Sequence, residues 1–562
     1  MNKLPAISFL SLFLCSLSMT TIAADHNIKE KSVTEFGARP DDGRDDTRAL
    51  RAAIEWARHT PGATLTFPPG VYRLKDAQAE QLERDVLEGK MGANPEQKIF
   101  TPYFSYVRGL DLAGSEGLTI MAQGATLLCE GWMEPITIED CTDTRLCGLT
   151  IDYARRPFSA GKVVAVTPQY FEVEFPTERE ITETMPLTRM TFWIHEQNRL
   201  YPDPIYFPKR ELLGNGRIRF HHTVPEQLLG ATAGVLHSFH FRPAILIHRS
   251  QNTTIEDVTI HAQPGMGIVG FDSRDIDIER LQVVPAPGQC FSTNTDATHF
   301  ACCEGKLRLN ACRFRGQGDD ATNVHGYYQC IVAARGKEAD LEVKAPTYTH
   351  AQVADVPRPG DCMELVERTT LKLVRTYEVV EAHHMVPQRG CTVTLSDTLP
   401  QRIDDYYLMN VTKLPSLIFE NSLVDSHLAR GVLVKTRDVV IRGNVFRHGT
   451  GTAIHIGAEG PWHEGTYAKN VLVENNTILG CGLGAGRQNG ACGIALNITA
   501  PDASASFLHD SIRIERNHIA GSGNDCGIYL GNANHVFIND NHVTGCRTAV
   551  CTHSVADLRA QP

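Results

Sequence analysis

Short segments of alternating apolar residues recur along the chain, separated by turns rich in asparagine and glycine. Asn421 precedes Asn444 by 23 residues, and Asn517 precedes Asn541 by 24. Apolar strands between these turns keep the same phase. A period in the low twenties, with several short strands in each unit, is typical of a right-handed parallel β-helix, in which each coil stacks on the one before it.

Asparagine at the repeated turn has a structural role in this interpretation. Its short side chain tolerates the left-handed backbone conformation, and amides on neighbouring coils can stack into a ladder. Leucine-rich repeats are the competing repeat class, but the leucine spacing that they require is absent.

Two long stretches, 156–243 and 327–412, lack the asparagine repeat and carry longer alternating segments, which predict antiparallel β insertions. Residues 49–57 predict an amphipathic helix that covers the open end of the solenoid. The predicted fold is all-β: a right-handed parallel β-helix with an N-terminal capping helix and two inserted, barrel-like antiparallel subdomains. The expected divisions are a signal peptide (1–23), the cap and first coils (24–155), insertion 1 (156–243), coils with an acidic motif (244–326), insertion 2 (327–412) and C-terminal coils (413–562).

Composition adds limits on partners and location. The chain has 562 residues and a net charge of −11, which argues against nucleic-acid binding. Lys3, the apolar run 7–19 and the small residues up to Ala23 predict a signal peptide cleaved after Ala23, and hence a periplasmic or extracellular protein. We expect no membrane span, and buried, stacked thiols explain the cysteines of the repeats. The oligomeric state stays open, with a homodimer among the options.

Candidate chemistry comes from acidic residues one coil apart. Asp296 lies 23 residues before Asp319 and 24 before Asp320. Strands on neighbouring coils are roughly 4.8 Å apart, so the three carboxyl groups should converge. They cannot all ionise freely, and a protonated acid beside ionised carboxylates is what glycoside hydrolysis needs. Turn-forming aspartates and a calcium site are the alternatives.

Further polar residues lie in phase with these aspartates. Arg430 begins the coil after insertion 2 and could bind sugar hydroxyls or form a structural ion pair. Lys435, His455 and His325 lie at strand ends on the same side. They could contact the sugar, and a structural role is the alternative. A tryptophan in a Gly-Pro loop suggests a platform for a sugar ring, or a loop anchor. The candidate substrate-binding residues are Arg430, Lys435, His325, His455, Trp462 and Glu464.

Several motifs resemble known families. The start of the mature chain resembles the pectate-lyase-like β-helix proteins. Asn-Thr-Asp at 294–296, followed by Gly-Asp-Asp at 318–320, resembles the acidic signature of glycoside hydrolase family 28, the polygalacturonases. The Gly-His-Gly and Arg-Ile-Lys motifs of that family are missing. The fuller similarity is to glycoside hydrolase family 110, the inverting α-1,3-galactosidases, and covers nearly the whole mature chain, including 315–326.

This second resemblance implies removal of terminal α-1,3-linked galactose from blood-group-B-type or linear α-galactosyl glycans, without a metal or other cofactor. By motif position, the three catalytic aspartates are Asp296, Asp319 and Asp320. By analogy with the polygalacturonases, Asp319 is the general acid and the other two hold and activate water. Inversion predicts an acid-to-base separation of roughly 6.5–9.5 Å. A polygalacturonase-like hydrolase and a non-catalytic carbohydrate-binding β-helix are the alternatives.

Overall fold

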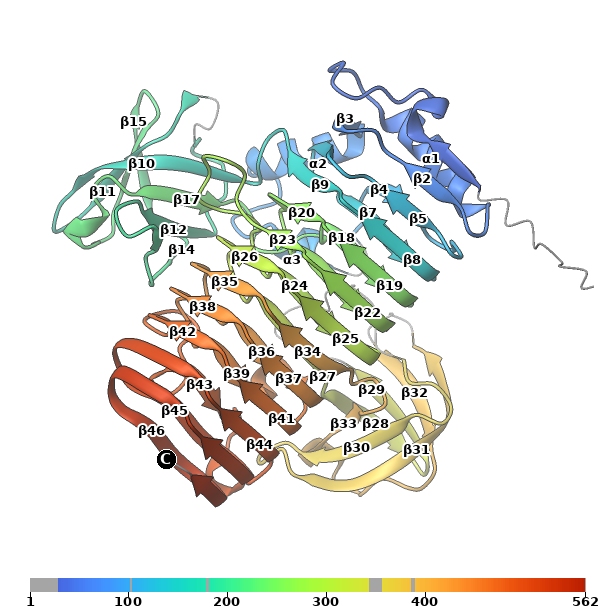
Figure 1. Cartoon of the computed structure of the whole chain (residues 1–562), viewed down its shortest axis with the longest axis vertical. Helices are drawn as coiled ribbons and strands as arrows, with labels where there is room; N and C mark the ends of the chain where they lie inside the picture. Colours follow the sequence, from blue (N-terminus) through green and yellow to red (C-terminus); the bar gives the residue numbers. More distant parts are fainter. Residues whose placement is uncertain (1–28, 102–103, 178–180, 343–355, 386–389, 561–562) are drawn as a thin grey trace, which may run out of the picture.

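The computed structural model describes residues 29–101, 104–177, 181–342, 356–385 and 390–560. The predicted signal peptide lies outside these residues. The described chain forms a right-handed parallel β-helix that carries two antiparallel insertions, as the sequence predicted (Figure 1). No helix in the described part of the chain is both long and apolar enough to cross a bilayer.

Each coil contributes one strand to each of three parallel faces. In one coil these are β21 (Ile268–Phe271), β22 (Arg274–Glu279) and β23 (Gln282–Val283), which pair in parallel with β24 (Thr298–Ala301), β25 (Glu304–Asn310) and β26 (Arg313–Arg315) of the next coil. We call the face that contains β24 the site sheet. Its other strands are β4 (Arg108–Asp111), β7 (Glu134–Glu139), β18 (Ile245–His248), β21, β27 (Thr322–Tyr327), β36 (Val432–Val434), β39 (Ile454–Ile456) and β43 (Ala491–Leu496), and the face continues into parts of β45 (His518–Asn539) and β46 (His542–Ala560).

Alternation along the strands of the site sheet decides which side chains reach solvent and which fill the core. Phe300, Val324, Val434 and Ile456 are register partners on successive coils, and all four are fully buried in the solenoid core. Each such side chain contributes about 1.5–3 kcal/mol through burial. Because the period is two, their sequence neighbours point to the outer surface of the site sheet.

An asparagine ladder joins the C-terminal coils. The amide of Asn444 donates to Asn476 Oδ1, Asn476 donates to Asn517 and Asn517 donates to Asn541, each at 2.9 Å. The predicted ladder is therefore present, but its members do not adopt the left-handed conformation. That conformation belongs to the residue before each of them, such as Asn475 with φ 54°.

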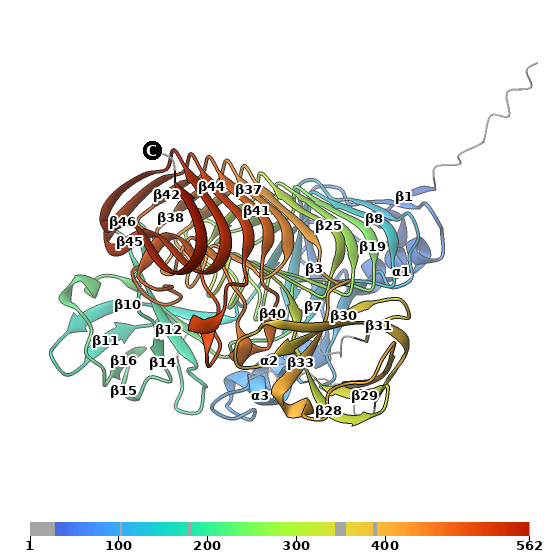
Figure 2. The same cartoon turned by 90° about the horizontal axis from the view of Figure 1, so that it is seen from below.

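The N-terminal helix α1 (Thr47–Arg58) caps the solenoid as predicted. Its apolar side chains, Leu50, Ala53, Ile54 and Ala57, are buried in the same core cluster as the first coils. Two further helices, α2 (Ala77–Leu87) and α3 (Glu96–Ile99), lie beside the solenoid on the side that carries the insertions (Figure 2).

Both insertions have cores of their own, and both lie on the same side of the solenoid (Figure 2). The first remains an open antiparallel sheet, whereas the second closes into a six-stranded barrel. The strands of the first are β10 (Phe158–Val166), β11 (Phe171–Glu174), β12 (Arg189–Ile194), β13 (Arg199–Leu200), β14 (Ile205–Tyr206), β15 (Arg210–Gly214), β16 (Arg217–Phe220) and β17 (Thr232–Leu236). Those of the second are β28 (Gln329–Arg335), β29 (Glu338–Glu342), β30 (Cys362–Glu367), β31 (Leu373–His384), β32 (Gly390–Leu395) and β33 (Tyr406–Asn410).

Candidate active site

Asp296, Asp320 and Arg430 occupy the same position on three successive coils. Each lies two residues before the first residue of its strand, which is β24, β27 or β36 respectively. The backbone repeats here: Ala297 N donates to the carbonyl of Asp320, and Ala321 N donates to the carbonyl of Arg430, both at 3.0 Å. Insertion 2 leaves the solenoid after β27 and returns before β36. The solenoid phase is therefore kept across the 110 residues that separate Asp320 from Arg430.

The three aspartates meet at this position. One carboxylate oxygen of each lies within 4.8 Å of one oxygen of the others. Burial, and then the neighbouring carboxyl groups of Asp320 and Asp296, raise the pKa of Asp319 to about 7. Burial and the charge of Asp320 also hold the pKa of Asp296 well above its ordinary value. The cluster therefore keeps a proton at neutral pH, as the sequence predicted.

Arg430 clamps Asp320. Its Nε and Nη2 donate to Oδ1 and Oδ2 of Asp320 at 2.9 Å each, and its backbone N–H donates to Oδ1 at 2.7 Å. A carboxylate that receives three hydrogen bonds from a guanidinium group and a backbone amide is stabilised in its ionised form. Both oxygens of Asp320 are thus engaged by Arg430.

A second ion-pair group extends from Arg430. Its Nη1 donates to Glu459 at 3.0 Å, and Glu459 also contacts Lys435 Nζ at 2.7 Å. Lys435 in turn pairs with Glu464. Burial would raise the pKa of Glu459, but Lys435 and Arg430 outweigh it and lower the pKa to about 2. Arg430 and Lys435, two of the predicted sugar-binding residues, are therefore neutralised by carboxylates of the protein itself.

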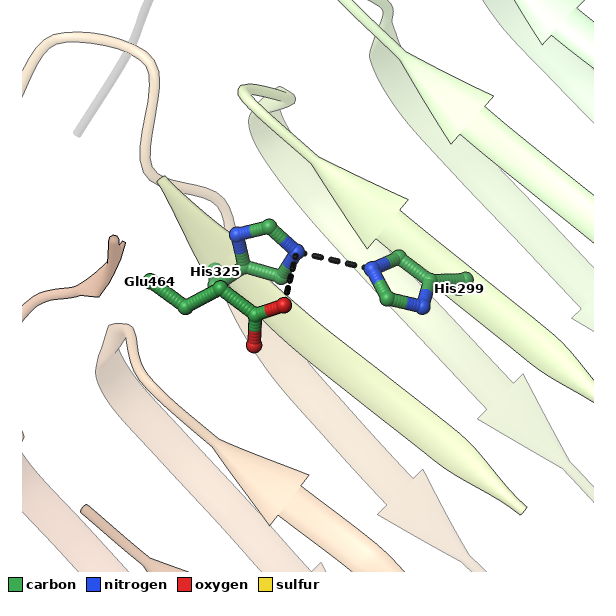
Figure 3. Close-up of side chains that lie close together, drawn as sticks. All are labelled: His299, His325 and Glu464. Carbon is green, nitrogen blue, oxygen red and sulfur yellow. Dashed lines mark hydrogen bonds and ion pairs between the residues drawn. The ribbon is translucent and has the colours of Figure 1, made fainter. Parts of the chain in front are cut away.

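Two histidines, His299 and His325, lie between Glu464 and Asp296, and Figure 3 shows them with Glu464. His299 Nδ1 lies 2.7 Å from Asp296 Oδ2, and His299 Nε2 lies 2.7 Å from His325 Nε2. His325 Nε2 is also 3.8 Å from Glu464 Oε1. Burial lowers the pKa of His299 to about 4 and that of His325 to about 3, so an isolated positive charge on either ring is disfavoured.

The structure separates the other predicted residues by burial. His455 is buried on β39 and its Nε2 contacts Asn497 Oδ1 at 2.8 Å. Trp462 is 44% exposed in the short 3-10 helix Gly460–Trp462. Glu464, two residues later, is buried because β40 (Glu464–Gly465) pairs antiparallel with the end of β27. Among the described contacts, neither His455 nor Trp462 is joined to the aspartates.

Sequence reasoning missed four residues that surround the cluster: His299, Glu459, Arg189 and His240. His299 follows Asp296 by three residues, and its place on an outward position of β24 was a usable signal. The other three come from loops or from insertion 1, and the repeat pattern does not indicate which way their side chains point. Arg189, from β12, donates to the carbonyl of Asn294 at 2.6 Å.

His240, near the aspartate cluster, is paired with Glu96. Its Nδ1 lies 2.8 Å from Glu96 Oε2 of α3, and its ring stacks on Phe100 with centroids 5.3 Å apart. Burial lowers the pKa of His240, but Glu96, with smaller contributions from Asp296 and Asp319, raises it above the ordinary value.

Gly318 is required by close approach. A Cβ at this position would lie 2.1 Å from the carbonyl oxygen of Asn294 and 2.2 Å from Arg189 Nη2. Any side chain here would push insertion 1 away from the coil that carries Asp319.

The nearest carboxylate oxygens of the three aspartates lie closer together than the acid-to-base separation expected for an inverting enzyme, so the expected spacing is wrong for these atoms. They lie within 4.8 Å of one another, whereas an inverting pair is expected at roughly 6.5–9.5 Å and a retaining pair at roughly 5–5.5 Å. The positive charge of Arg430 and the raised pKa values of Asp296 and Asp319 allow three acidic groups to lie this close together.

Two groups of side chains could hold a cation by donor type and spacing: the three aspartates, and His299 with His325 and Glu464. In each group a protein cation already contacts a carboxylate, Arg430 in the first and Lys435 in the second. A separate cavity of about 720 Å³ lies beside insertion 1, and none of the three aspartates lines it.

Fold and site together define a right-handed parallel β-helix protein with a buried acidic cluster on the face that carries its insertions. Comparison with known proteins names its relatives. The chain is 27% identical over 508 residues to α-1,3-galactosidase B of Bacteroides thetaiotaomicron, covering 84% of this chain and 79% of that protein. It is 26% identical over 513 residues to α-1,3-galactosidase A of Bacteroides fragilis strain YCH46, covering 86% and 82%. The chain is thus a homologue of proteins named α-1,3-galactosidase.

No family model matches the chain. Among solved structures, the A-module of mannuronan C-5 epimerase AlgE4 from Azotobacter vinelandii aligns over 94% of this chain and 100% of its own, with 14% identity and a TM-score of 0.45. An exopolygalacturonase from Thermotoga maritima aligns over 94% and 91%, with 12% identity and a TM-score of 0.41.

Proposed function

We propose that the protein is an exo-acting α-1,3-galactosidase that hydrolyses terminal α-1,3-linked galactose from blood-group-B-type or linear α-galactosyl glycans. The proposal rests on one observation above all: the carboxyl groups of Asp296, Asp319 and Asp320 meet within 4.8 Å of one another, and Arg430 holds Asp320 from the next coil. The names of the homologues supply the sugar and the linkage.

Asp319 is the proposed general acid. Because its pKa is about 7, about half of the group is protonated at pH 7, and the protonated form can donate its proton to the departing glycosidic oxygen. It is also less buried than Asp296 and Asp320, so it is the member of the cluster that a substrate reaches most directly.

Asp320 and Asp296 are proposed to hold and activate the attacking water. Spacing alone would favour a covalent, retaining mechanism, but both oxygens of Asp320 accept hydrogen bonds from Arg430, which makes Asp320 a poor nucleophile. Asp296 is similarly held by His299. Attack by water, with inversion at the anomeric carbon, is therefore the mechanism that we propose.

A site for a chain end fits the surroundings. Arg189 of insertion 1 contacts the coil of Asp296, and the loop 460–465 pairs with β27 from the other direction. These elements would wall a pocket that takes one terminal sugar. Trp462 is exposed and is proposed as a stacking surface near the entrance.

The direct test is release of galactose from a Gal-α-1,3-Gal disaccharide by the wild type and by Asp319→Asn. The matched control is Asp540→Asn, the same change at an exposed aspartate of the last coils. We expect turnover in the wild type and the control and at least a 100-fold loss in Asp319→Asn, since general acid catalysis contributes roughly 10²–10⁴-fold. Proton NMR of the first product gives the anomer: β-galactose supports inversion and α-galactose contradicts it.

Two alternatives remain as outcomes. A polygalacturonase-like hydrolase needs cations that are available for substrate carboxylates, and the pairing of Arg430 and Lys435 with protein carboxylates disfavours it. Activity on oligogalacturonides without activity on galactosides would establish it. A non-catalytic glycan-binding β-helix would bind the disaccharide without turnover.

We also propose export of the protein, from the signal-peptide pattern of residues 1–23. Expression of the full sequence in a Gram-negative host, followed by N-terminal sequencing of the periplasmic or secreted protein, should give a mature chain that begins at Ala24. Retention of the intact N-terminus in the cytoplasm would contradict this proposal.

A further inference from the structure

The direction of hydrogen bonding through His299 and His325 is fixed by one carbonyl group. His325 Nδ1 lies 3.0 Å from the carbonyl oxygen of Gly326, which can only accept. His325 therefore carries its proton on Nδ1. Its Nε2 lies 2.7 Å from His299 Nε2 and, in the neutral ring, is an acceptor.

The same reasoning moves one step along the chain of contacts. To donate to His325, His299 must carry a proton on Nε2. Its Nδ1 lies 2.7 Å from Asp296 Oδ2. A neutral His299 with a proton on Nε2 accepts at Nδ1, so Asp296 must be the donor. If the Asp296 proton moves to Nδ1 of His299 instead, His299 becomes a cation beside an Asp296 anion. In both forms Asp296 and His299 together carry no net charge.

We propose that His299 and His325 are positioning residues that form a one-way hydrogen-bond relay, Asp296 to His299 to His325 to the Gly326 carbonyl, and that this relay keeps a proton between Asp296 Oδ2 and His299 Nδ1. The proposal refines the proposed function, on which its activity readout rests. It assigns the removal of the water proton to Asp320, which is paired with Arg430, and leaves Asp296 to orient that water.

The charges around the relay are consistent with a neutral pair. His299 faces Glu464, Lys435, Asp320 and His240, and His325 faces Glu464 and Lys435. Lys435 neutralises Glu464, and Arg430 neutralises Asp320. A further full negative charge on Asp296 would have His240 as its main cation, and His240 is already paired with Glu96. Burial favours the neutral form of the pair.

Neutron diffraction from crystals of the full mature chain, exchanged into D₂O at pH 7, tests the relay without any assay. We expect deuterium between the two Nε2 atoms, on Nδ1 of His325, and between Asp296 and His299. Two bare Nε2 atoms facing each other, or a metal ion between them, would overturn the proposal. The diffraction result does not depend on whether the protein hydrolyses galactosides. Failure of the relay and failure of the proposed function are therefore distinguishable.

A pair of substitutions gives the kinetic test. His325→Phe removes the acceptor, so His299 can release its Nε2 proton to solvent and take the Asp296 proton onto Nδ1, which leaves Asp296 as a full anion beside a neutral ring. That charge raises the pKa of Asp319 further, and the alkaline limb of kcat/KM should move to higher pH by at least half a pH unit. His325→Gln keeps an acceptor oxygen, and its limb should stay near the wild-type position.

The control is His509→Phe, a buried histidine of the C-terminal coils whose Nδ1 accepts from Ala468 N at 3.0 Å. Its pH profile should match the wild type whatever its stability. An unchanged limb in His325→Phe, or equal shifts in all three variants, would refute the relay. If His325→Phe does not fold, the diffraction experiment on the wild type still decides.

Discussion

Arg430 holds both carboxylate oxygens of Asp320 from the equivalent position one coil further along the solenoid. The pair is nearly buried, with 17% of the Arg430 side chain and 3% of that of Asp320 exposed. Parallel stacking alone places the two backbones about one strand spacing apart. The planar guanidinium group then spans the gap in a two-point contact that a lysine cannot reproduce.

Arg430→Lys should therefore lower kcat by roughly 10–100-fold while the protein stays folded, because Asp320 loses its fixed orientation. Arg430→Ala should also destabilise the protein by about 3–5 kcal/mol, since it leaves a buried carboxylate without its partner. Chemical denaturation and steady-state kinetics measure the two effects. The double variant Arg430→Ala/Asp320→Asn should regain part of the stability and none of the activity. Full activity in Arg430→Lys would show that orientation of Asp320 is unimportant.

The pH dependence of activity follows from Asp319. A general acid must be protonated, and its pKa is about 7, so kcat/KM should fall above that pH with an apparent pKa near 7. A profile from pH 5 to pH 9 on the disaccharide gives this limb. A limb that begins only above pH 8.5 would assign the acid to another group.

Asp319 should also affect stability, in the opposite sense to a salt-bridged carboxylate. Folding raises the pKa of Asp319 above its ordinary value of 3.8, so the folded protein holds the proton more tightly than the unfolded chain does. That contribution is complete below about pH 4 and is lost as pH rises through 7. Asp319→Asn removes the titration, so its Tm should exceed that of the wild type at pH 8 and approach it at pH 5. Asp540→Asn should show no such difference.

Gly318→Ala should disturb the contact between insertion 1 and the solenoid. The new Cβ meets the Asn294 carbonyl at 2.1 Å and Arg189 Nη2 at 2.2 Å, and the backbone atom cannot move as a flexible side chain can. We expect at least a tenfold loss of kcat/KM from displacement of the coil that carries Asp319. At Gly531, in the last coils, a Cβ would approach atoms no closer than 3.0 Å, and Gly531→Ala should be milder.

The asparagine ladder should contribute to stability and leave catalysis unchanged. Asn476→Ala removes a buried amide that bonds to ladder members on both sides and to the Ile441 carbonyl. A loss of about 1–3 kcal/mol of unfolding free energy is expected, with kcat unaffected. Asn541 lies at the end of the ladder and is partly exposed, so Asn541→Ala should reduce the unfolding free energy less. Equal losses at both positions would mean that the ladder does not act as a unit.

The sequence by itself determined the solenoid and the acidic part of the site. A parallel β-helix converts a spacing of one coil into contact in space, so Asp296, Asp319 and Asp320 could be brought together by counting residues. Arg430 could be placed in the same way, because an insertion that leaves and returns at one coil edge preserves the phase. Within a strand, the period of two also puts His299 on the outer surface, a signal that the sequence reasoning did not use.

Only the tertiary structure decided what surrounds these residues. Glu459, Arg189 and His240 reach the cluster from loops and from insertion 1, and the path of such segments depends on packing far from the repeat. Whether Lys435 faces a ligand or a protein carboxylate was likewise undecided, because phase fixes the position of a backbone but not the partner of its side chain. The Asp296–His299–His325 contacts depend on ring orientations that no spacing in the sequence specifies.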